Sequence, residues 1–480
     1  MRIILCILLA SLATSLRAEP EMAPSSNSNS NSNSNSNSNS NSNSNSNSVS
    51  ASSYATDLMS LYREARLEDP RVLAAYARAV GGQARQREAF GGLLPQLNAS
   101  GSLNRTKYDN RTTEQVYNNE RYVVSLTQHI YNKAAWENYQ KFKSLARQGE
   151  FQAVDAQAEA TVDLAQRYFV ALASDDELEL VMAERRATQK NLDRVNALYE
   201  RKLAMITDVL DLKARVDALA AQEVEARNQV RLSREDLSEL VGRAVVEKLS
   251  RIREDVALQV PGESLDVWIT RAVAANPALK ARESALAAAE AAVREGKGGH
   301  YPQLSLNLSA QRSDVGYDNT LAPLSDSYVA SVGVQIPLYS GGSTSARVRA
   351  LYNERLATEQ ELEAIRRQVV KETTGAYLTA QSSVDRIRAT RNALESAEKS
   401  SAAAEKGFQY GVVNAVDVLT SVQNEYAARR DLLKAQYDFI TNLLVLNRWA
   451  GRLSEQSVEN VNVWLARSEE ARALERKTTE

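Results

Sequence analysis

Two patterns of apolar residues divide the chain into strands and long helices. Residues 97–104 and 304–310 alternate apolar or small residues with Asn and Ser, which is typical of strands that have one polar face. A second alternating segment follows each of these after a polar turn. We therefore predict two hairpins, with strands at about 96–106 and 121–131 and at about 302–313 and 327–339.

In the return helices after Asp208 and after Asp417, apolar residues recur at spacings of three and four, which predicts coiled-coil helices. No proline interrupts residues 132–203 or 345–407, so each of these segments is expected to form a single helix. At about 1.5 Å per residue, the two helices would be roughly 105 and 95 Å long. Each long helix is followed by a short turn and by a return helix of about half its length. The short helices predicted at 70–90 and 277–294 would stack end to end with the return helices and complete two columns per repeat.

The chain contains the same succession of sequence phrases twice. Asp69-Pro70 corresponds to Asn276-Pro277 at a spacing of 207 residues, and Asp208-Val209-Leu210 corresponds to Asp417-Val418-Leu419 at a spacing of 209. This small drift indicates tandem duplication. We predict repeat 1 at residues 54–242 with a helical tip at about 200–208, and repeat 2 at residues 276–451 with a tip at about 408–417. The two segments that follow the repeats, which we expect to form a belt around the middle of the helices, are 243–275 and 452–480, the second of which ends in a charged tail.

Four strands of about ten residues can cross a bilayer but cannot close a barrel, because small membrane barrels need about eight strands or more. Open edges are not tolerated in lipid, so transmembrane strands here would require oligomerisation, and three chains would supply twelve strands. The polar face of the strands carries Asn, Ser, Thr and Gln, which suits a water-filled lumen. Two ordinary hairpins packed on a globular core are the alternative, and the helices alone would also fit a soluble coiled-coil tether.

The N-terminus has the layout of a secretory signal peptide, with Arg2 followed by an apolar run, and we place the signal at residues 1–18. Residues 19–53 form a linker whose Asn-Ser dipeptides have no apolar side chains to bury, so we expect it to be disordered. The single cysteine, Cys6, lies in the signal segment, so the mature chain would contain no disulfide, cysteine-ligated metal or thiol nucleophile.

The composition gives little support to an enzyme or a nucleic-acid-binding protein. The chain has 58 basic and 60 acidic residues, so it lacks the excess positive charge of a nucleic-acid-binding protein. Its two histidines, His129 and His300, lie in or next to predicted strands without cysteine partners. We therefore predict no catalytic residues, no metal site and no cofactor.

The combination of motifs resembles the TolC family of outer membrane factors over roughly residues 54–464. The motifs are Asn276-Pro277, Tyr301-Pro302-Gln303-Leu304, the strand-to-helix corner at 334–342, and Phe408-Gln409-Tyr410-Gly411 leading to Asp417-Val418-Leu419. The resemblance implies a mainly helical fold with a membrane β-barrel. It implies a trimer in the outer membrane, with a twelve-strand barrel continuous with a twelve-helix periplasmic barrel.

The resemblance also implies a function and partners. Such a duct conducts passively, while an inner-membrane transporter of the ABC or RND type supplies energy and a periplasmic adaptor protein docks at the helical tips. The cargo would be secreted proteins or drugs, and nucleic acid is not expected. The alternatives are a trimeric coiled-coil surface protein of the adhesin type, whose strands would gather at one terminus, and a periplasmic adaptor.

In the family, aspartates near the tips surround the narrowest point of the duct, and Asp208 and Asp417 fall on those positions. Three copies of Asp417 would repel one another and favour cations. The alternative is that each aspartate only caps its helix, and one residue could serve both purposes.

Several positions depart from the family pattern. Thr420 replaces a second acidic residue, and Asp211 is a candidate to supply that charge from the other repeat. Phe408, the counterpart of Tyr199, lacks the hydroxyl of the family's closing bond, and Val413 lacks its positive charge, for which Arg201 or Lys202 could substitute. Gly411 favours a tight turn where the first tip has Lys202, so we expect the tips to be inequivalent.

Overall fold

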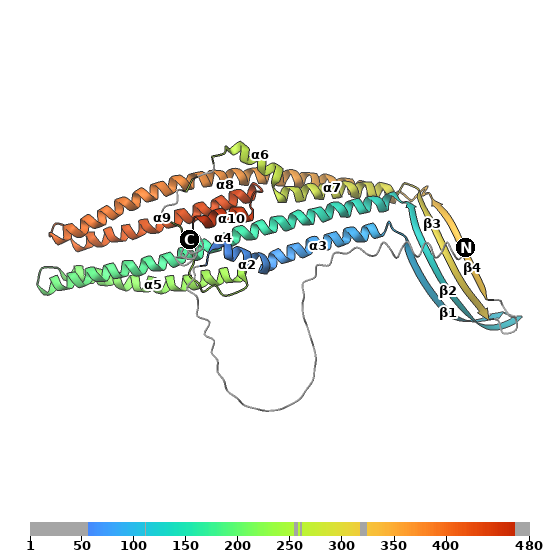
Figure 1. Ribbon diagram of the computed structural model, residues 1–480, viewed down its shortest axis with the longest axis horizontal. Coiled ribbons are helices and arrows are strands. Elements are labelled where there is room, and N and C mark those ends of the chain that lie inside the picture. Colours follow the sequence, from blue (N-terminus) through green and yellow to red (C-terminus); the bar gives the residue numbers. More distant parts are fainter. Residues whose placement is uncertain (1–55, 111, 254–257, 260–261, 317–323, 466–480) are drawn as a thin grey trace, which may run out of the picture. The chain divides into compact units, whose positions relative to one another are not determined.

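The computed structural model describes residues 56–110, 112–253, 258–259, 262–316 and 324–465. The predicted signal peptide and Asn-Ser linker lie outside the described residues, as does the charged tail after residue 465. The fold is mainly helical with one small antiparallel sheet, as the sequence predicts (Figure 1). No helix in the described part of the chain is both long and apolar enough to span a membrane.

Each repeat contributes the same succession of elements. Both contain a short helix, a hairpin, a long helix and a return helix in this order, and each short helix directly follows a further helix of eleven residues, α2 or α6. Repeat 1 consists of α2 (Leu58–Glu68), α3 (Pro70–Gly91), β1 (Gln96–Asn110), β2 (Thr113–Tyr131), α4 (Lys133–Glu200) and α5 (Ile206–Val241). Repeat 2 consists of α7 (Pro277–Gly298), β3 (Gln303–Gly316), β4 (Ser325–Gln335), α8 (Ser343–Gln409) and α9 (Ala415–Trp449). In the two segments that follow the repeats, α6 (Leu265–Ala275) precedes α7 as α2 precedes α3, and α10 (Glu455–Val463) follows α9.

The short helices α3 and α7 stack on the return helices, as the sequence predicts. In repeat 2, the side-chain amide of Asn276 donates a hydrogen bond to the carbonyl of Trp449 at 2.9 Å, so that α7 begins where α9 ends. Gly451 has φ +67°, and a Cβ on this residue would lie 2.6 Å from the carbonyl oxygen of Ala275. A glycine is therefore required at this joint.

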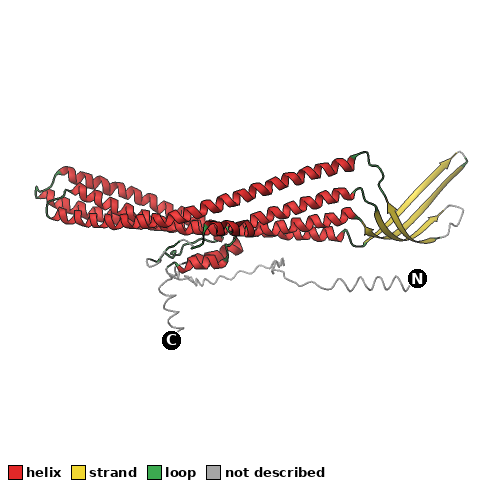
Figure 2. Cartoon of the chain, turned by 90° about the horizontal axis from the view of Figure 1, so that it is seen from above, coloured by secondary structure: helices red, strands yellow, loops and turns green. Residues whose placement is uncertain are grey.

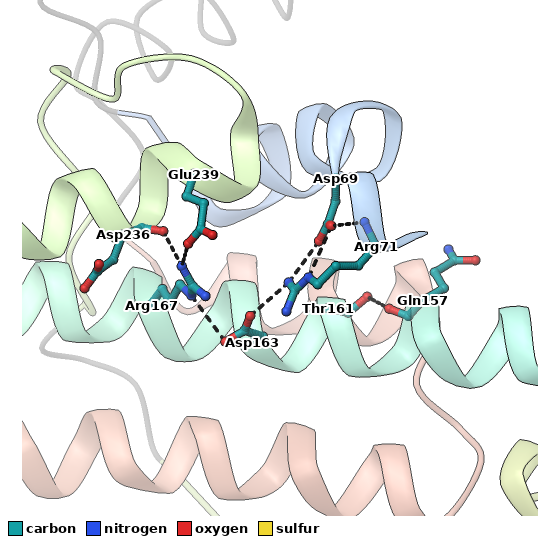
Figure 3. A network of polar contacts seen from close by, with 8 residues as sticks. All are labelled: Asp69, Arg71, Gln157, Thr161, Asp163, Arg167, Asp236 and Glu239. Carbon is teal, nitrogen blue, oxygen red and sulfur yellow. Dashed lines mark hydrogen bonds and ion pairs between the residues drawn. The ribbon is translucent and has the colours of Figure 1, made fainter. Parts of the chain in front are cut away.

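The corresponding joint in repeat 1 is held by ion pairs (Figure 3). Asp69 accepts a hydrogen bond from the backbone N–H of Arg71 at 2.8 Å, and the Arg71 guanidinium contacts both Asp69 and Asp163, each at 2.9 Å. Asp163 also pairs with Arg167, which reaches Glu239 near the end of α5 at 2.6 Å. Burial alone would raise the pKa of Asp69, but the hydrogen bonds from Arg71 outweigh it and the pKa is lowered.

The helices form a single layer. Towards the strands, α3, α4, α7 and α8 lie side by side in this order, and towards the tips the order is α5, α4, α9 and α8. Figure 2 shows the strands together at one end of the long helices and the helical turns at the other. The layer therefore has two free edges, one formed by α3 and α5 and the other by α8.

The main hydrophobic core lies at the middle of the layer, where α2 and α10 pack against it. Tyr168 and Phe169 of α4 make an edge-to-face contact, and Phe169 stacks on Tyr437 of α9 with 5.6 Å between ring centroids. Because α2, α10 and the segment after α5 all join this core, they cover one face of the helix layer.

The four strands pair in the order β1-β2-β3-β4, all antiparallel. The hairpin β1–β2 continues to Asn110 and Thr113, beyond the predicted strand ends, because backbone pairing persists after the apolar alternation stops. Conversely, β4 ends at Gln335 rather than near residue 339, since Pro337 has no N–H to donate to a ladder.

Candidate functional site at the helical tips

The first tip joins α4 to α5 through residues 201–205. The amides of Arg201 and Leu203 donate to the carbonyl of Leu198, and Lys202 takes a left-handed conformation with φ 62°. Met205 occupies the N-cap of α5 and provides no side-chain hydrogen bond to the helix. The first turn of α5 therefore has no side-chain cap.

The second tip joins α8 to α9 through residues 410–414 and has nearly the same backbone. Gly411 is left-handed with φ 74°, and the amide of Val412 donates to the carbonyl of Gly407 at 2.9 Å. Here the N-cap is Asn414, whose side chain accepts a hydrogen bond from the Asp417 amide at 2.7 Å. The second tip therefore has a side-chain cap that the first lacks.

Gly411 and Lys202 give the two turns the same left-handed backbone conformation. Both residues are left-handed, and Lys202 is the one residue other than glycine that has a positive φ in the described part of the chain. A lysine in this conformation brings its Cβ close to the following carbonyl oxygen. The tips thus differ in local strain and capping rather than in the path of the chain.

The two tips also differ in where a large and a small residue stand in a contact between the helix end and the turn. In the second tip, Val413 packs against Gly407, and a Cβ on Gly407 would lie 2.6 Å from the Cγ2 atom of Val413. The corresponding residues of the first tip are Leu198 and Ala204, with the larger side chain on the helix and the smaller one in the turn. Val413 therefore has a packing role in place of a charge.

Phe408 joins a small hydrophobic cluster that connects the two helical hairpins. The cluster combines Phe408, Ala415 and Leu419 of the second tip with residues of α4 and α5, namely Leu192, Val195, Val209 and Leu212. Phe408, which has no hydroxyl to donate, thus makes apolar contact between the two tips. The cluster also brings the first turns of α5 and α9 together.

The three candidate acidic residues differ in exposure. Asp417 and Asp211 are exposed and Asp208 is half-buried. None of their carboxylates forms a hydrogen bond or ion pair with another described residue. Because Asn414 accepts the bond that caps α9, capping does not account for the carboxylate of Asp417.

A groove of about 930 Å³ runs along the helix layer on the face opposite α2 and α10. On α4 it is lined by Val170 and Ala173, about half a turn from Tyr168, which faces the covered side. Residues of α5, α8 and α9 also line it, so all four helices contribute to the uncovered face.

Asp208 and Asp417 each begin a series of residues, spaced seven apart, that reaches the groove. On α9, the residues at intervals of seven after Asp417 are Asn424, Asp431 and Asp438, and the last two line the groove. On α5, the same interval leads from Asp208 through Arg215 and Gln222 to Gln229, which also lines it. A coiled coil keeps residues seven apart on one face. The same interval leads from Asp211 to Ala218 and Glu225, and neither of these residues lines the groove.

Buried ionic contacts near the groove connect the helices. Glu184 of α4 is fully buried between Arg215 of α5 and Arg430 of α9. Asp176 accepts a short hydrogen bond from the Tyr437 hydroxyl, and it pairs with Arg251 at 2.7 Å. Burial raises the pKa of Asp176 despite both partners. The sequence does not predict these contacts, because residues that lie far apart along the chain give no local signal.

Of the predicted tip residues, the structure gives roles in the turn or its packing to Lys202, Gly411, Phe408 and Val413. The carbonyl of Tyr199 accepts a hydrogen bond from the Lys202 amide. The Thr420 hydroxyl donates a hydrogen bond to the carbonyl of Val416, one turn earlier. The capping role of Asn414 was missed, although an asparagine three residues before an acidic residue at a helix start is a recognisable signal.

The chain is similar to known proteins over nearly its whole described length. A family model described as "Outer membrane efflux protein" matches residues 61–243 and 268–452. The outer membrane protein TolC of Vibrio cholerae is 29% identical over 415 residues, which are 86% of this chain and 94% of that protein. The alkaline protease secretion protein AprF of Pseudomonas aeruginosa is 28% identical over 421 residues, covering 85% of this chain and 87% of that protein.

The fold is shared with solved structures. The CmeC outer membrane channel of Campylobacter jejuni matches this chain with a TM-score of 0.75 and 14% sequence identity, and the match covers 85% of this chain and 89% of CmeC. These findings confirm the predicted resemblance, the outer membrane location and the function of an export channel, and they do not favour the adhesin or the adaptor. Because the family model matches both repeats, the chain belongs to the outer membrane efflux protein family.

Proposed function

We propose that three copies of the chain form a continuous duct through the outer membrane and the periplasm. The free edges support this proposal: the sheet ends at β1 and β4, and the helix layer ends at α8 and at α3 with α5. The two edges of each layer differ, and such heterologous edges close into a ring when the rotation between copies permits. Three copies supply twelve strands and twelve helical columns, and a closed sheet leaves no open edge in lipid.

In this assembly the uncovered face of the helix layer lines the lumen, and the tips form its narrowest point. Asp417 and Asp208 lie on the groove side of the first turns of α9 and α5, with no described partner for their carboxylates. Three copies of each would create rings of negative charge that favour cations. The seven-residue intervals that lead from these aspartates to the groove support this placement.

The family is a channel type rather than an enzyme family, and we propose passive conduction driven by other proteins. Apolar side chains at both tips are strongly exposed, with Leu203 at 73%, Met205 at 67%, Tyr410 at 82% and Val412 at 81%. This surface suits a periplasmic adaptor, which would connect the duct to an inner-membrane transporter of the ABC or RND type. AprF is named as a protease secretion protein, so protein cargo is one candidate beside drugs.

Planar bilayer recordings on the purified trimer test the constriction. We expect Asp417→Asn and Asp208→Asn to reduce cation preference, because each removes one ring of charge. Asp211→Asn is the matched control, since it removes a carboxylate from the same helical turn of α5 but from a line that does not reach the groove. Equal loss of selectivity in Asp211→Asn and Asp208→Asn would contradict the assignment, and a pure protein without pores would contradict the duct itself.

A further inference from the structure

The interface that joins the two repeats inside the chain has a counterpart that would form between copies. Inside the chain, α4 packs against α7 and α9, and we call this contact the internal interface. The duplication relates α8 to α4, α3 to α7 and α5 to α9. In the proposed ring, the α8 edge of one copy therefore meets the α3 and α5 edge of the next copy as α4 meets α7 and α9.

A constant spacing of 209 residues relates the corresponding long helices and the corresponding return helices. Tyr168 of α4 and Tyr377 of α8 have this spacing, and the hydroxyl of each donates a hydrogen bond to a backbone carbonyl of the segment 243–275. Leu237 of α5 and Leu446 of α9 also have this spacing, and both are fully buried. Residues at this spacing therefore occupy equivalent places in the two repeats.

The internal interface shows how α4 and α9 are aligned. Phe169 of α4 stacks on Tyr437 of α9. Arg448, eleven residues later on α9, reaches Glu159, ten residues earlier on α4, at 3.2 Å. The two helices are thus antiparallel, and a step forward along α9 corresponds to a step of nearly equal length back along α4.

This alignment predicts a pair of opposite charges between copies. Leu444 of α9 and Val162 of α4 each lie seven residues from the stacked rings, so they are level, and both are buried in the main core. Their counterparts are Glu235 of α5 and Lys371 of α8, which are exposed in the single chain. Among the described residues, Glu235 forms no ion pair, and Lys371 pairs with its neighbour Glu372 alone, at 3.3 Å. An apolar pair of the internal interface is thus replaced by an acid and a base.

A second pair of opposite charges lies one helical turn away. Glu239 of α5 corresponds to Arg448, and in the same alignment it is level with Arg367 of α8. The side chains of Glu239 and Arg367 are 71% and 79% exposed. The internal interface has its base on the return helix and its acid on the long helix, and this pair has the reverse order. Because Arg367 would repel Arg448, the charges favour docking of α8 on α5 of the next copy over docking on α9.

We propose that Glu235 pairs with Lys371 of the next copy and Glu239 with Arg367 of the next copy, at the middle of the helix layer. The proposal rests on the proposed ring and names the residues through which one copy recognises the next. Inside the chain, Glu239 also pairs with Arg167 at 2.6 Å, which holds its carboxylate at the end of α5. Ion pairs beside a helix interface determine partner choice and orientation, and opposite charges across an interface suppress wrong partners.

A charge exchange tests the first pair, because a ring of identical copies repeats it at every interface. Glu235→Lys and Lys371→Glu each place like charges at all three interfaces. The temperature at which the purified trimer dissociates in detergent should therefore fall by several degrees in both variants, and more at low salt than at high salt. The double variant restores opposite charges and should recover most of this loss. Arg366→Glu is the matched control, since its counterpart Gln157 contacts Tyr76 of its own repeat, and it should dissociate as the wild type does.

A cysteine pair gives a second measurement that does not depend on charge. Cys6, the chain's single cysteine, is replaced by serine, and Glu235→Cys is combined with Lys371→Cys. Because these residues lie on opposite edges of one chain, mild oxidation should link separate copies into covalent dimers and trimers. The control combines Glu235→Cys with Asn392→Cys, which lies three heptads, or about 30 Å, further along the same face of α8. It should be linked at least tenfold less.

The results separate the pairing from the ring. A trimeric wild type whose double charge variant recovers none of the lost stability would overturn the pairing and leave the ring in place. So would equal destabilisation by Arg366→Glu and Lys371→Glu, or equal linking of the two cysteine pairs. A wild-type protein that is not a trimer in detergent would overturn both the ring and the pairing.

Discussion

A methyl group added at Gly407 should destabilise the second tip, and a compensating change at Val413 should restore it. A Cβ on Gly407 would lie 2.6 Å from Cγ2 of Val413 and 3.3 Å from its Cβ. Carbon atoms pack at about 3.5–4.0 Å, so the first of these contacts is too close by about 1 Å. We therefore expect Gly407→Ala to cost about 1–3 kcal/mol in packing, partly offset by up to about 1 kcal/mol of improved helix propensity.

The pair Leu198 and Ala204 in the first tip shows how the clash can be relieved. Val413→Ala removes the Cγ2 atom, so the double variant should keep the helix propensity gained at residue 407 without the overlap. The coupling energy between the two substitutions should then be favourable by about 1–3 kcal/mol, as for residues in direct contact.

Hydrogen exchange of the Val412 and Val413 amides measures this local stability, because both amides donate to the carbonyl of Gly407, at 2.9 and 3.4 Å. Exchange should be faster than in the wild type in Gly407→Ala, and the double variant should return to the wild-type rate or below it. If the effects of the two single substitutions add without coupling, the contact between Gly407 and Val413 is not what shapes the second tip.

The other predictions concern strain, capping and charge. Lys202→Gly should slow exchange of the Leu203 amide by an amount equivalent to about 1 kcal/mol, because it relieves a left-handed lysine, whereas Lys202→Ala should not. Asn414→Ala should destabilise the start of α9 by about 1 kcal/mol, and Met205→Asn should stabilise the start of α5, both measured by amide exchange in the first helical turns. Asp69 has a lowered pKa, so its stabilising effect is present above pH 3.8 and is lost as the pH falls through its folded-state value; Asp69→Asn should lower the thermal midpoint at pH 7 and have less effect in acid. Asp176 has a raised pKa, so its contribution to the stability of the fold is lost as the pH rises. The thermal midpoint of Asp176→Asn, relative to that of the wild type, should therefore be higher at pH 7 than in acid. The opposite trend would contradict the burial of this charge.

The sequence predicts the elements of this fold well where one periodicity persists. The long helices α4 and α8 differ from their predicted bounds by three residues or fewer, because neither contains proline. The outer ends of β1 and β2 were underestimated. Their residues are mostly polar and the apolar alternation stops, although the backbone ladder continues.

The sequence predicts where the candidate aspartates lie along the helices, but not the side-chain contacts near them. The aspartates were found because the duplication aligns Asp208 with Asp417 at equivalent helix starts. The groove and the contact of Glu184 with Arg215 and Arg430 were not found. These depend on how α4, α5 and α9 rotate about their axes, and a single helix's pattern determines which of its faces is apolar but not which neighbour that face meets.

The duplication preserved the backbone while the side chains that stabilise it diverged. Both tips place a left-handed residue at the same position, yet the second has Gly411 and the capping Asn414, whereas the first has Lys202 and the uncapped Met205. A left-handed lysine costs about 1–2 kcal/mol and a missing cap about 1 kcal/mol. The turn of the first tip is therefore less stable by itself, by about 2–3 kcal/mol, and depends more on the cluster that Phe408 forms between the hairpins. Contact between the tips thus compensates for weak local structure in one of them, so separating the hairpins should loosen the first tip before the second.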